Sequence, residues 1–589
     1  MLWSLILIPL LVFTGPPASA ATGIDEFFER FTADWVRASP ELATFTQYFS
    51  GAEQVRMDSQ LSPETERVRK ERVDRARRGL AELRRFDVKQ LSASQRLSAR
   101  VLEWQLDAIV QSARFEGHHY VFNQGIGGFP AGLVRFLTDI HPARNPGDVE
   151  NYLLRLSQVA SRLDEAIVVA RTAARRGIIP PRFILTATIG QVERLAAPEP
   201  GNNVLVASYE ERISKSPSIS ADDRRKFRLA ATKTVADSVV PSFRRVIALL
   251  EEQRKAATDD AGISKLPEGA AAYASRLRGY TSTPLTADQI HRTGLEKVTQ
   301  VEGAMDKLLR ELGYRDGSVK DRFAKAQDDH SYPDAPDVRT TILADYEKIM
   351  REAERRAGSL FDLRPKALVV IRRIPEYAER NAAANYSVSA RDGSRPGTFN
   401  VPLVGPKFSR LGMRTLAYHE AVPGHHFQVA LQQEDKDLPR FRADRIIREG
   451  MTAFSEGWGL YAEALAMESG WYDDDLPGKL GALDAQLFRA KRLVVDTGLH
   501  TKGWTRQQAI DYGISVSEVE RYVAAPGQAC AYMIGQLKIL ELRDKARREL
   551  GGKYSLPEFH NVVLRTGAVP LEVLEEVVNE YIAGKKPKG

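Results

Sequence analysis

The sequence predicts a mainly α-helical fold with a small β-sheet inserted in it. Apolar residues recur at helical spacing through most of the 589 residues, as expected of amphipathic helices packed on a core. Segments typical of strands are few, and the best candidates, with β-branched or aromatic residues between glycine and proline borders, are residues 367–375 and 397–404. A chain of this length is long enough for a large two-lobed molecule or for several domains.

Composition places the chain among ordinary globular proteins. Hydrophobic residues make up 43% and charged residues 27% of it, which excludes a disordered, collagen-like or polytopic membrane protein. The formal net charge of +7 comes from 84 basic and 77 acidic side chains, without a basic cluster before the C-terminal GKKPKG. Nucleic-acid binding requires clustered positive charge, so no nucleic-acid partner is expected.

The first twenty residues, MLWSLILIPLLVFTGPPASA, differ from the rest. A mostly apolar run is followed by a Gly-Pro break and by Ala18-Ser19-Ala20, which is typical of a cleaved secretory signal. We therefore expect an exported chain, periplasmic or secreted, that begins near Ala21, although an uncleaved N-terminal anchor stays open. No lipobox cysteine follows, so no lipid anchor is expected. The one cysteine, Cys530, leaves the fold without an internal disulfide.

The helices follow in order along the chain. The first marked one is predicted to have Ser62 as its N-cap, with Pro63 at the first helical position and Glu64 and Glu66 in the first turn. In the N-terminal half, further amphipathic stretches predict helices over residues 92–115, 148–176, 220–257, 285–313 and 338–357. After the two predicted strands, helices are expected over residues 411–432, 449–468, 478–498, 505–522 and 528–550.

A polar, Asp- and Pro-containing stretch at residues 324–337, AKAQDDHSYPDAPD, is the most plausible internal boundary. It predicts a helical N-terminal part, residues 21–330, and a C-terminal part, residues 331–589, that together form one bilobed unit. No later segment is apolar for long enough to span a bilayer.

The segment 419–428, HEAVPGHHFQ, holds three of the ten histidines of the chain. In the zinc-protease pattern H-E-x-x-H the two histidines lie one turn apart, and the glutamate faces the metal site. Here Pro423 takes the place of the second histidine. On an unbroken helix His425 would point about 120° away from His419, and His426 would lie about 10.5 Å further along the axis.

Pro423 and Gly424 suggest two interpretations of this segment. Proline removes a helical hydrogen bond and glycine accepts unusual backbone angles, so the two residues can form a bulge that returns His425 to the ligand position. Alternatively, the pair ends the helix and the histidines are surface or capping residues. The spacing alone also leaves open whether His425 or His426 binds.

A downstream helix offers a further ligand. Glu449, Glu456 and Glu463 are spaced by seven in EGMTAFSEGWGLYAEALAME and therefore lie along one stripe. The stripe could be a solvated face, but the aromatic and aliphatic residues around it leave little of the helix for water. Buried carboxylates need a cation or strong donors, and Glu456 with two histidines would complete a zinc site.

These motifs carry a resemblance to a known family. HEAVPGHHFQ and SEGWGLYAE, together with RLVVDTGLHTKGWT at residues 492–505 and RYVAAPGQACAYMIGQLKI at residues 521–539, resemble the bacterial domain-of-unknown-function 885 family, whose members are similar to gluzincin metallopeptidases. The resemblance implies a large bilobed helical fold with the small sheet near the active-site helix. If two residues are inserted after Ala421, Gly424-His425 matches the Gly-His of the gluzincin pattern.

In that register His419, His425 and Glu456 are the zinc ligands and Glu420 is the general base. Tyr532 lies in a segment that looks like the gluzincin helix supplying a phenol donor to the oxyanion. His500 is a second candidate for that work, or for orienting Asp496, although ordinary packing is an alternative for both.

Substrate binding is predicted from two further features. The segment GTFNVPLV, residues 397–404, is expected to pair with a peptide substrate as an exposed strand. Arg521 and Tyr522 could hold a terminal carboxylate.

The sequence thus predicts an exported zinc-dependent peptidase that acts on oligopeptides. A catalytically inactive peptide- or metal-binding protein on the same scaffold stays open, as does a zinc hydrolase of non-peptide amides or esters. Retention of Glu420 beside His419 favours the enzyme, because a binding protein needs no base next to its metal.

Overall fold

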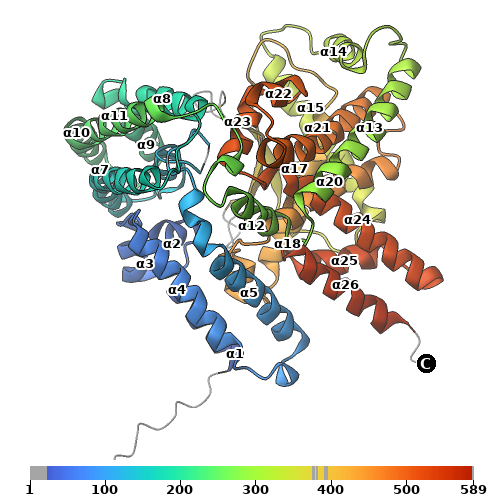
Figure 1. Cartoon of the computed structure of the whole chain (residues 1–589), viewed down its shortest axis with the longest axis horizontal. Helices are drawn as coiled ribbons and strands as arrows, with labels where there is room; N and C mark the ends of the chain where they lie inside the picture. The colour runs from blue at the N-terminus through green and yellow to red at the C-terminus, as the bar shows by residue number, and fades with distance from the viewer. Residues whose placement is uncertain (1–22, 126, 375–378, 380–382, 390–394, 587–589) are drawn as a thin grey trace, which may run out of the picture.

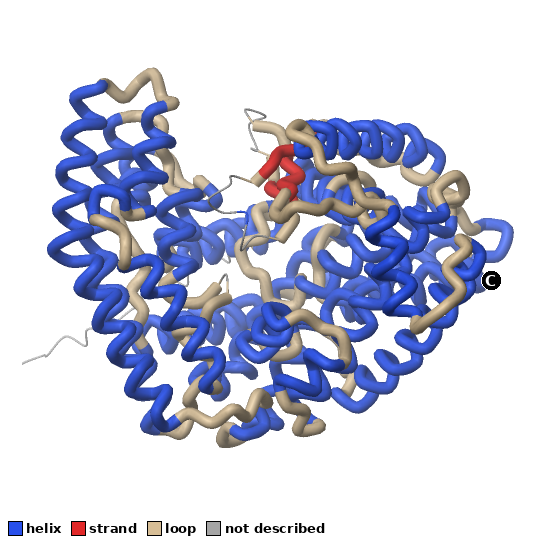
Figure 2. The backbone as a smooth tube through the Cα atoms, turned by 90° about the horizontal axis from the view of Figure 1, so that it is seen from above, coloured by secondary structure: helices blue, strands red, loops and turns tan. Residues whose placement is uncertain are grey.

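The computed structural model describes residues 23–586 except 126, 375–378, 380–382 and 390–394. Helices dominate it, and the strands are few and short (Figures 1 and 2). The predicted mainly α-helical class with a small sheet is therefore confirmed. The predicted signal sequence and the predicted start near Ala21 lie outside the described residues.

One group of helices precedes the sheet in the chain, and a second group follows it. The first group comprises α1 (Ile24–Arg37), α2 (Pro40–Thr46), α3 (Gly51–Asp58), α4 (Glu66–Leu83), α5 (Ala93–Ser112), α6 (Ala131–Arg135), α7 (Pro146–Arg175), α8 (Arg182–Ala196), α9 (Val204–Ser214), α10 (Ala221–Thr234), α11 (Val240–Ala256), α12 (Gly269–Thr281), α13 (Ala287–Glu311), α14 (Val319–Asp329) and α15 (Val338–Arg356). The second group comprises α17 (Met413–Glu420), α18 (His425–Glu434), α19 (Arg440–Ala443), α20 (Thr452–Glu468), α21 (Leu476–Thr501), α22 (Arg506–Asp511), α23 (Val516–Ala524), α24 (Ala531–Leu550), α25 (Leu556–Thr566) and α26 (Leu571–Lys585).

Local sequence explains most helix starts, with one correction. Helix α5 begins with a capping box between Ser92 and Gln95. The expected N-cap Ser62 is wrong: α4 begins at Glu66, where the hydroxyl of Thr65 accepts a hydrogen bond from the backbone N–H of Val68 at 3.3 Å. Ser62 instead bonds to the carboxylate of Glu41.

Three of the long predicted helices are interrupted, one of them (residues 411–432) between α17 and α18. Residues 220–257 form α10 and α11 with one π-helical turn, Val235–Val239, between them, ahead of Pro241, whose missing N–H favours such an irregularity. Residues 505–522 form α22 and α23, because Gly513 adopts a positive φ of 98° between them.

The hydrophobic core consists of clusters that join distant parts of the sequence. One large cluster packs helices α1, α4 and α5 against α15, α17, α20 and α24–α26. A second one is formed mainly by α7–α11, which lie together at the left of Figure 1. A third joins α12 and α13 to α21 and α24. A fourth, smaller cluster joins α8 to α21, α22 and α23. Three of the four clusters cross residue 330, and the predicted division there stays a prediction.

The sheet has three strands in the order β1-β3-β2. Strand β1 (Val369–Arg373) pairs parallel to β3 (Gly397–Val401), and β2 (Asn385–Ser387) pairs antiparallel to β3. Both predicted strands are present, and β2 is additional. The expectation that residues 397–404 pair with a substrate is wrong for β3, because it is the central strand and its backbone is occupied on both sides.

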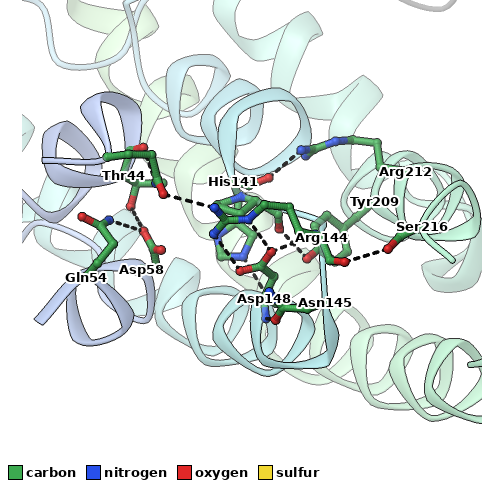
Figure 3. Close-up of polar contacts among 12 residues, drawn as sticks. Thr44, Gln54, Asp58, His141, Arg144, Asn145, Asp148, Tyr209, Arg212 and Ser216 are labelled. Atoms are coloured by element: carbon green, nitrogen blue, oxygen red, sulfur yellow. Dashed lines mark hydrogen bonds and ion pairs between the residues drawn. The ribbon is translucent and has the colours of Figure 1, made fainter. Parts of the chain in front are cut away.

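A buried polar network holds the N-terminal helices together (Figure 3). Arg155, fully buried on α7, donates to the carbonyl of Met57, to Thr44 Oγ1 at 2.6 Å and to His141 Nδ1 at 2.8 Å. The hydroxyl of Thr44 in turn donates to Asp58 at 2.6 Å. Because these groups satisfy one another, the cluster is structural.

None of the helices within the described part of the chain is long and apolar enough to cross a bilayer.

Candidate metal centre

The predicted motif forms a helix, a tight turn and a second helix. Helix α17 ends at Glu420, the Val422–Pro423 peptide bond is cis, and α18 begins at His425. The indole N–H of Trp458 on α20 donates to the carbonyls of Pro423 at 2.9 Å and Gly424 at 3.2 Å. Both sequence interpretations are thus partly right: Pro-Gly does end the helix, and the turn still returns His425 to His419.

Gly424 permits this return because the backbone passes very close to the end of α17. A Cβ atom at this position would lie 1.9 Å from the carbonyl oxygen of His419 and 2.3 Å from that of Tyr418. Any side chain would therefore push the second helix away from the first.

Three side chains converge from α17, α18 and α20. Each of His419, His425 and Glu456 offers a ligand atom, and these atoms lie within 4.8 Å of one another. Nε2 of His419 is 3.7 Å and Nε2 of His425 is 3.6 Å from Oε2 of Glu456. The two imidazole rings are nearly perpendicular, with their centroids 4.7 Å apart. These are the residues that the sequence singled out.

His426 lies elsewhere. Its Nδ1 is 3.0 Å from the hydroxyl of Tyr386 on β2, and burial lowers its pKa to about 4. Of the two adjacent histidines, His425 is the one that faces Glu456.

Glu463 orients the first histidine. Nδ1 of His419 donates to Oε1 of Glu463 at 2.7 Å, and both side chains are buried. The bond holds Nε2 toward Glu456, as an outer carboxylate does for many metal-binding histidines. Sequence analysis placed Glu463 on the same stripe as Glu456 but gave it no role. Glu449, the third member, pairs with Arg72 instead.

The charges of the site are strongly coupled. Burial acts to raise the pKa of Glu456, but its contacts with His419 and His425 outweigh this and hold the pKa well below its usual range. Burial acts to lower the pKa of His419, but Glu456 and Glu463 together raise it to about 10. In the absence of a metal, a proton on the histidine therefore compensates the carboxylates.

The donor set fits a divalent metal ion. Two imidazole nitrogens and one carboxylate oxygen from three different helices meet at one point, which is a ligand set that zinc favours. The second oxygen of Glu463 is buried without a hydrogen-bond partner among the described residues. A bound cation would supply the positive charge that the proton on His419 supplies in the metal-free chain.

Glu420 and Tyr532 border these ligands. Burial raises the pKa of Glu420, while the nearby charges of His419 and His425 act to lower it. Burial, followed by the negative charge of Glu456, raises the pKa of Tyr532. The ring of Tyr532 lies against the guanidinium of Arg492, 4.5 Å from its centroid. A buried carboxyl group and a phenol thus border the candidate ligands.

His500 lies apart from this group. It is fully buried, its Nδ1 accepts from the backbone N–H of Ile263 and its Nε2 donates to the carbonyl of Tyr522, both at 3.1 Å. Asp496 is held by the hydroxyl of Tyr273 at 2.6 Å and by the N–H of Gly527 at 2.9 Å. Both ring nitrogens of His500 are occupied by backbone groups, so packing accounts for this histidine.

Arg521 and Tyr522 also have internal partners. Both hydrogen-bond to the carboxylate of Glu518, at 2.9 Å from Nη2 of Arg521 and 2.9 Å from the hydroxyl of Tyr522. Neither is free to take a terminal carboxylate in this arrangement.

Gly459 provides a test of ligand positioning. A Cβ atom there would lie 2.6 Å from Cε1 of the His419 ring, so Gly459→Ala should displace the ring and weaken metal binding by about 10–100-fold, the cost of losing ligand orientation. Competition with a chromophoric chelator would measure the affinity. Gly303→Ala on α13, where a Cβ meets nothing within 4 Å, is the control. Equal affinities in the two variants would contradict the prediction.

Comparison with known proteins places the chain in a family. A family model described as "Bacterial protein of unknown function (DUF885)" matches residues 40–578. A solved "putative lipoprotein" from Colwellia psychrerythraea is 28% identical, with a TM-score of 0.87 over 95% of this chain and 100% of that one.

A "putative lipoprotein of unknown function" from Shewanella oneidensis is 19% identical, with a TM-score of 0.71 over 95% of this chain and 100% of that one; this likeness shows the fold alone. No similar protein was found among functionally curated proteins. Because the family model matches nearly the whole chain, the protein belongs to the bacterial DUF885 family of proteins of unknown function.

Proposed function

We propose that this protein is an exported, zinc-dependent peptidase that hydrolyses oligopeptides. The observation that carries the proposal is the convergence of His419, His425 and Glu456 directly beside the buried carboxylate of Glu420. A metal-binding protein requires the first three residues only, whereas hydrolysis also requires a base. A zinc ion held there would act as a Lewis acid toward the scissile carbonyl and toward water.

Glu420 performs the proton transfers in this proposal. Burial is the first cause that raises its pKa toward neutral pH. A carboxyl group with a pKa nearer to the working pH can both accept and return a proton. Glu420 takes the proton of the attacking water and delivers it to the leaving amine. Its position next to His419 on α17 fixes it at the edge of the ligand group.

Tyr532 serves as the donor to the developing oxyanion. Its phenol lies near enough to Glu456 for that charge to affect its pKa. Arg492 against the ring face restrains the side chain. A donor that is already positioned costs no reorganisation when negative charge develops.

Export is proposed from the N-terminal sequence. The apolar run with its small-x-small end is typical of a secretory signal. The similar solved structure from Colwellia psychrerythraea is described as a "putative lipoprotein", and lipoproteins are a class of exported proteins, which agrees with this placement.

Digestion of a mixed peptide library tests the function. We expect the zinc-loaded chain to cleave oligopeptides, to lose this activity after chelation, and to regain it when zinc is added back, with products identified by mass spectrometry. Peptides that bind without cleavage would instead indicate a binding protein. Cleavage of simple esters or acyl amides but not of peptides would indicate the non-peptide hydrolase.

A further inference from the structure

Two arginines beside the metal centre have no carboxylate partner among the described residues. Arg489 on α21 is half-buried, and its charge acts on both Glu420 and Tyr532. Arg445, in the loop before α20, is also half-buried, and its charge interacts with Glu456. Nε of each guanidinium is buried and unpartnered. A partly desolvated guanidinium normally acquires a carboxylate, so both side chains have unused binding capacity.

Neighbouring arginines differ in this respect. Arg492, one turn from Arg489 on the same helix, donates to Glu518 at 2.9 Å, and Arg521 shares that carboxylate. Asp484 is close enough to Arg489 for its pKa to be affected, but the two make no ion pair in the described structure. On α21, therefore, Arg492 has a carboxylate partner, whereas Arg489, whose charge acts on the proposed base, has none among the described residues.

Arg445 is held in an unusual conformation. It has a positive φ of 52°, which is uncommon for a residue with a long side chain and marks positions that the surrounding structure dictates. Its Nη2 donates to the hydroxyl of Ser455 at 2.9 Å, next to Glu456 in the sequence. Burial, followed by the positive charge of Arg448, lowers its pKa to about 10. Each of the two arginines thus lies beside the ligand group without an ion pair to a carboxylate among the described residues.

We propose that Arg489 and Arg445 bind a carboxylate of the substrate beside the metal centre. The substrate class is then a short peptide with a free carboxylate at or near the bond that is cleaved, either its C-terminus or an Asp or Glu side chain. This assignment rests on the proposed peptidase function and narrows it. The planar guanidinium offers paired donors that match the two oxygens of a carboxylate.

The charge balance of the site agrees with an anionic substrate. The three carboxylates Glu420, Glu456 and Glu463 together with a divalent cation carry one net negative charge. Adding the two guanidinium groups changes this to one net positive charge. One substrate carboxylate restores neutrality in a region where unbalanced charge is costly.

Binding measurements that need no turnover test the proposal. In the zinc-loaded Glu420→Gln chain, calorimetry would compare Ala-Ala-Ala with its C-terminal amide, and Ala-Asp-Ala amide with Ala-Asn-Ala amide. The first pair reports on a terminal carboxylate and the second on a side-chain carboxylate. We expect one acidic peptide to bind more tightly than its neutral counterpart, and we call the ratio of the two affinities the preference. Arg489→Met should reduce this preference roughly 10–100-fold, because a charge-assisted hydrogen-bonded pair is lost. Arg445→Met should reduce it in the same direction.

Conservative and remote variants separate binding from folding. Arg489→Lys retains the positive charge but lacks the paired, planar N–H donors of a guanidinium, so it should give an intermediate preference. Arg245→Met on α11, which removes a surface pair with Asp164, should leave the preference unchanged. The inference is overturned if the parent chain does not favour either acidic peptide, or if both arginine variants retain the full preference. A failure of the peptidase proposal appears separately, as absence of cleavage by the unmodified zinc-loaded chain.

Discussion

We expect the purified protein to bind one zinc ion per chain and to lose it when His419, His425 or Glu456 is replaced by alanine. Each side chain would supply one of the three ligand atoms found together in the described part of the chain, so its loss should weaken binding by more than the roughly 10–100-fold that changes in orienting residues cost. Glu463→Gln, which alters the partner of His419, should stay within that smaller range. Metal analysis after dialysis would measure the stoichiometry.

The adjacent histidine supplies a matched control. His426→Gln should retain the metal, because His426 faces Tyr386 on the sheet. Thermal unfolding gives a second readout, since zinc at about 1,000 times its dissociation constant should stabilise the fold by about 4 kcal/mol. A wild-type chain that contains no metal and gains no stability with zinc would rule out the site. Retention of zinc by His425→Ala together with its loss in His426→Gln would assign the other histidine.

Zinc binding should also weaken as the pH falls. Burial acts to lower the pKa of His419, but Glu456 and Glu463 raise it to about 10 in the metal-free chain. Since the metal requires the neutral ring, it displaces a proton at any pH below that value, and the apparent affinity falls by up to about tenfold per pH unit. Calorimetry in buffers of different ionisation enthalpy would detect the released proton.

Glu420→Gln should abolish hydrolysis while leaving zinc bound. The change retains the shape of the side chain and removes only its ability to accept a proton, so we expect kcat to fall by about 10²–10⁴-fold with little change in metal content. Steady-state cleavage of the best library peptide, together with metal analysis of the same sample, would measure both.

Glu468→Gln is the control for this change. Glu468 ends α20 and pairs with Arg543 at 2.7 Å, at the end of the helix beyond Glu463, and its loss should leave cleavage unaffected. Full activity in Glu420→Gln would remove the proposed base, and loss of zinc in the same variant would show that the residue supports the metal rather than the proton transfer.

Much of the fold could be predicted from local sequence. The helices α5, α7, α13 and α15 and the strands β1 and β3 lie where periodicity and capping residues placed them, within a few residues. Errors arose where a local signal competed with another, as when Thr65 rather than Ser62 capped α4. The strand β2 was missed because three residues carry too little pattern to be recognised.

The candidate site, too, could be predicted only in part from the sequence. Histidine and glutamate in HEAVPGHHFQ, and the stripe that contains Glu456, identified the ligand candidates because side-chain chemistry and spacing can be read directly from the sequence. The helical geometry could not decide between His425 and His426, since the answer depends on the angle between α17 and α18. That angle is set by the turn at Gly424 and by Trp458, a residue from another helix.

The sequence by itself determined the helical class, the donor types and their approximate positions, since these follow from periodicity and side-chain chemistry. Only the tertiary structure decided which histidine faces Glu456, that Glu463 orients His419 and that His500 is held by backbone groups. It also left Arg445 and Arg489 beside the site without a carboxylate partner among the described residues. These outcomes depend on contacts between segments far apart in the chain, where packing rather than local pattern sets distance, burial and charge.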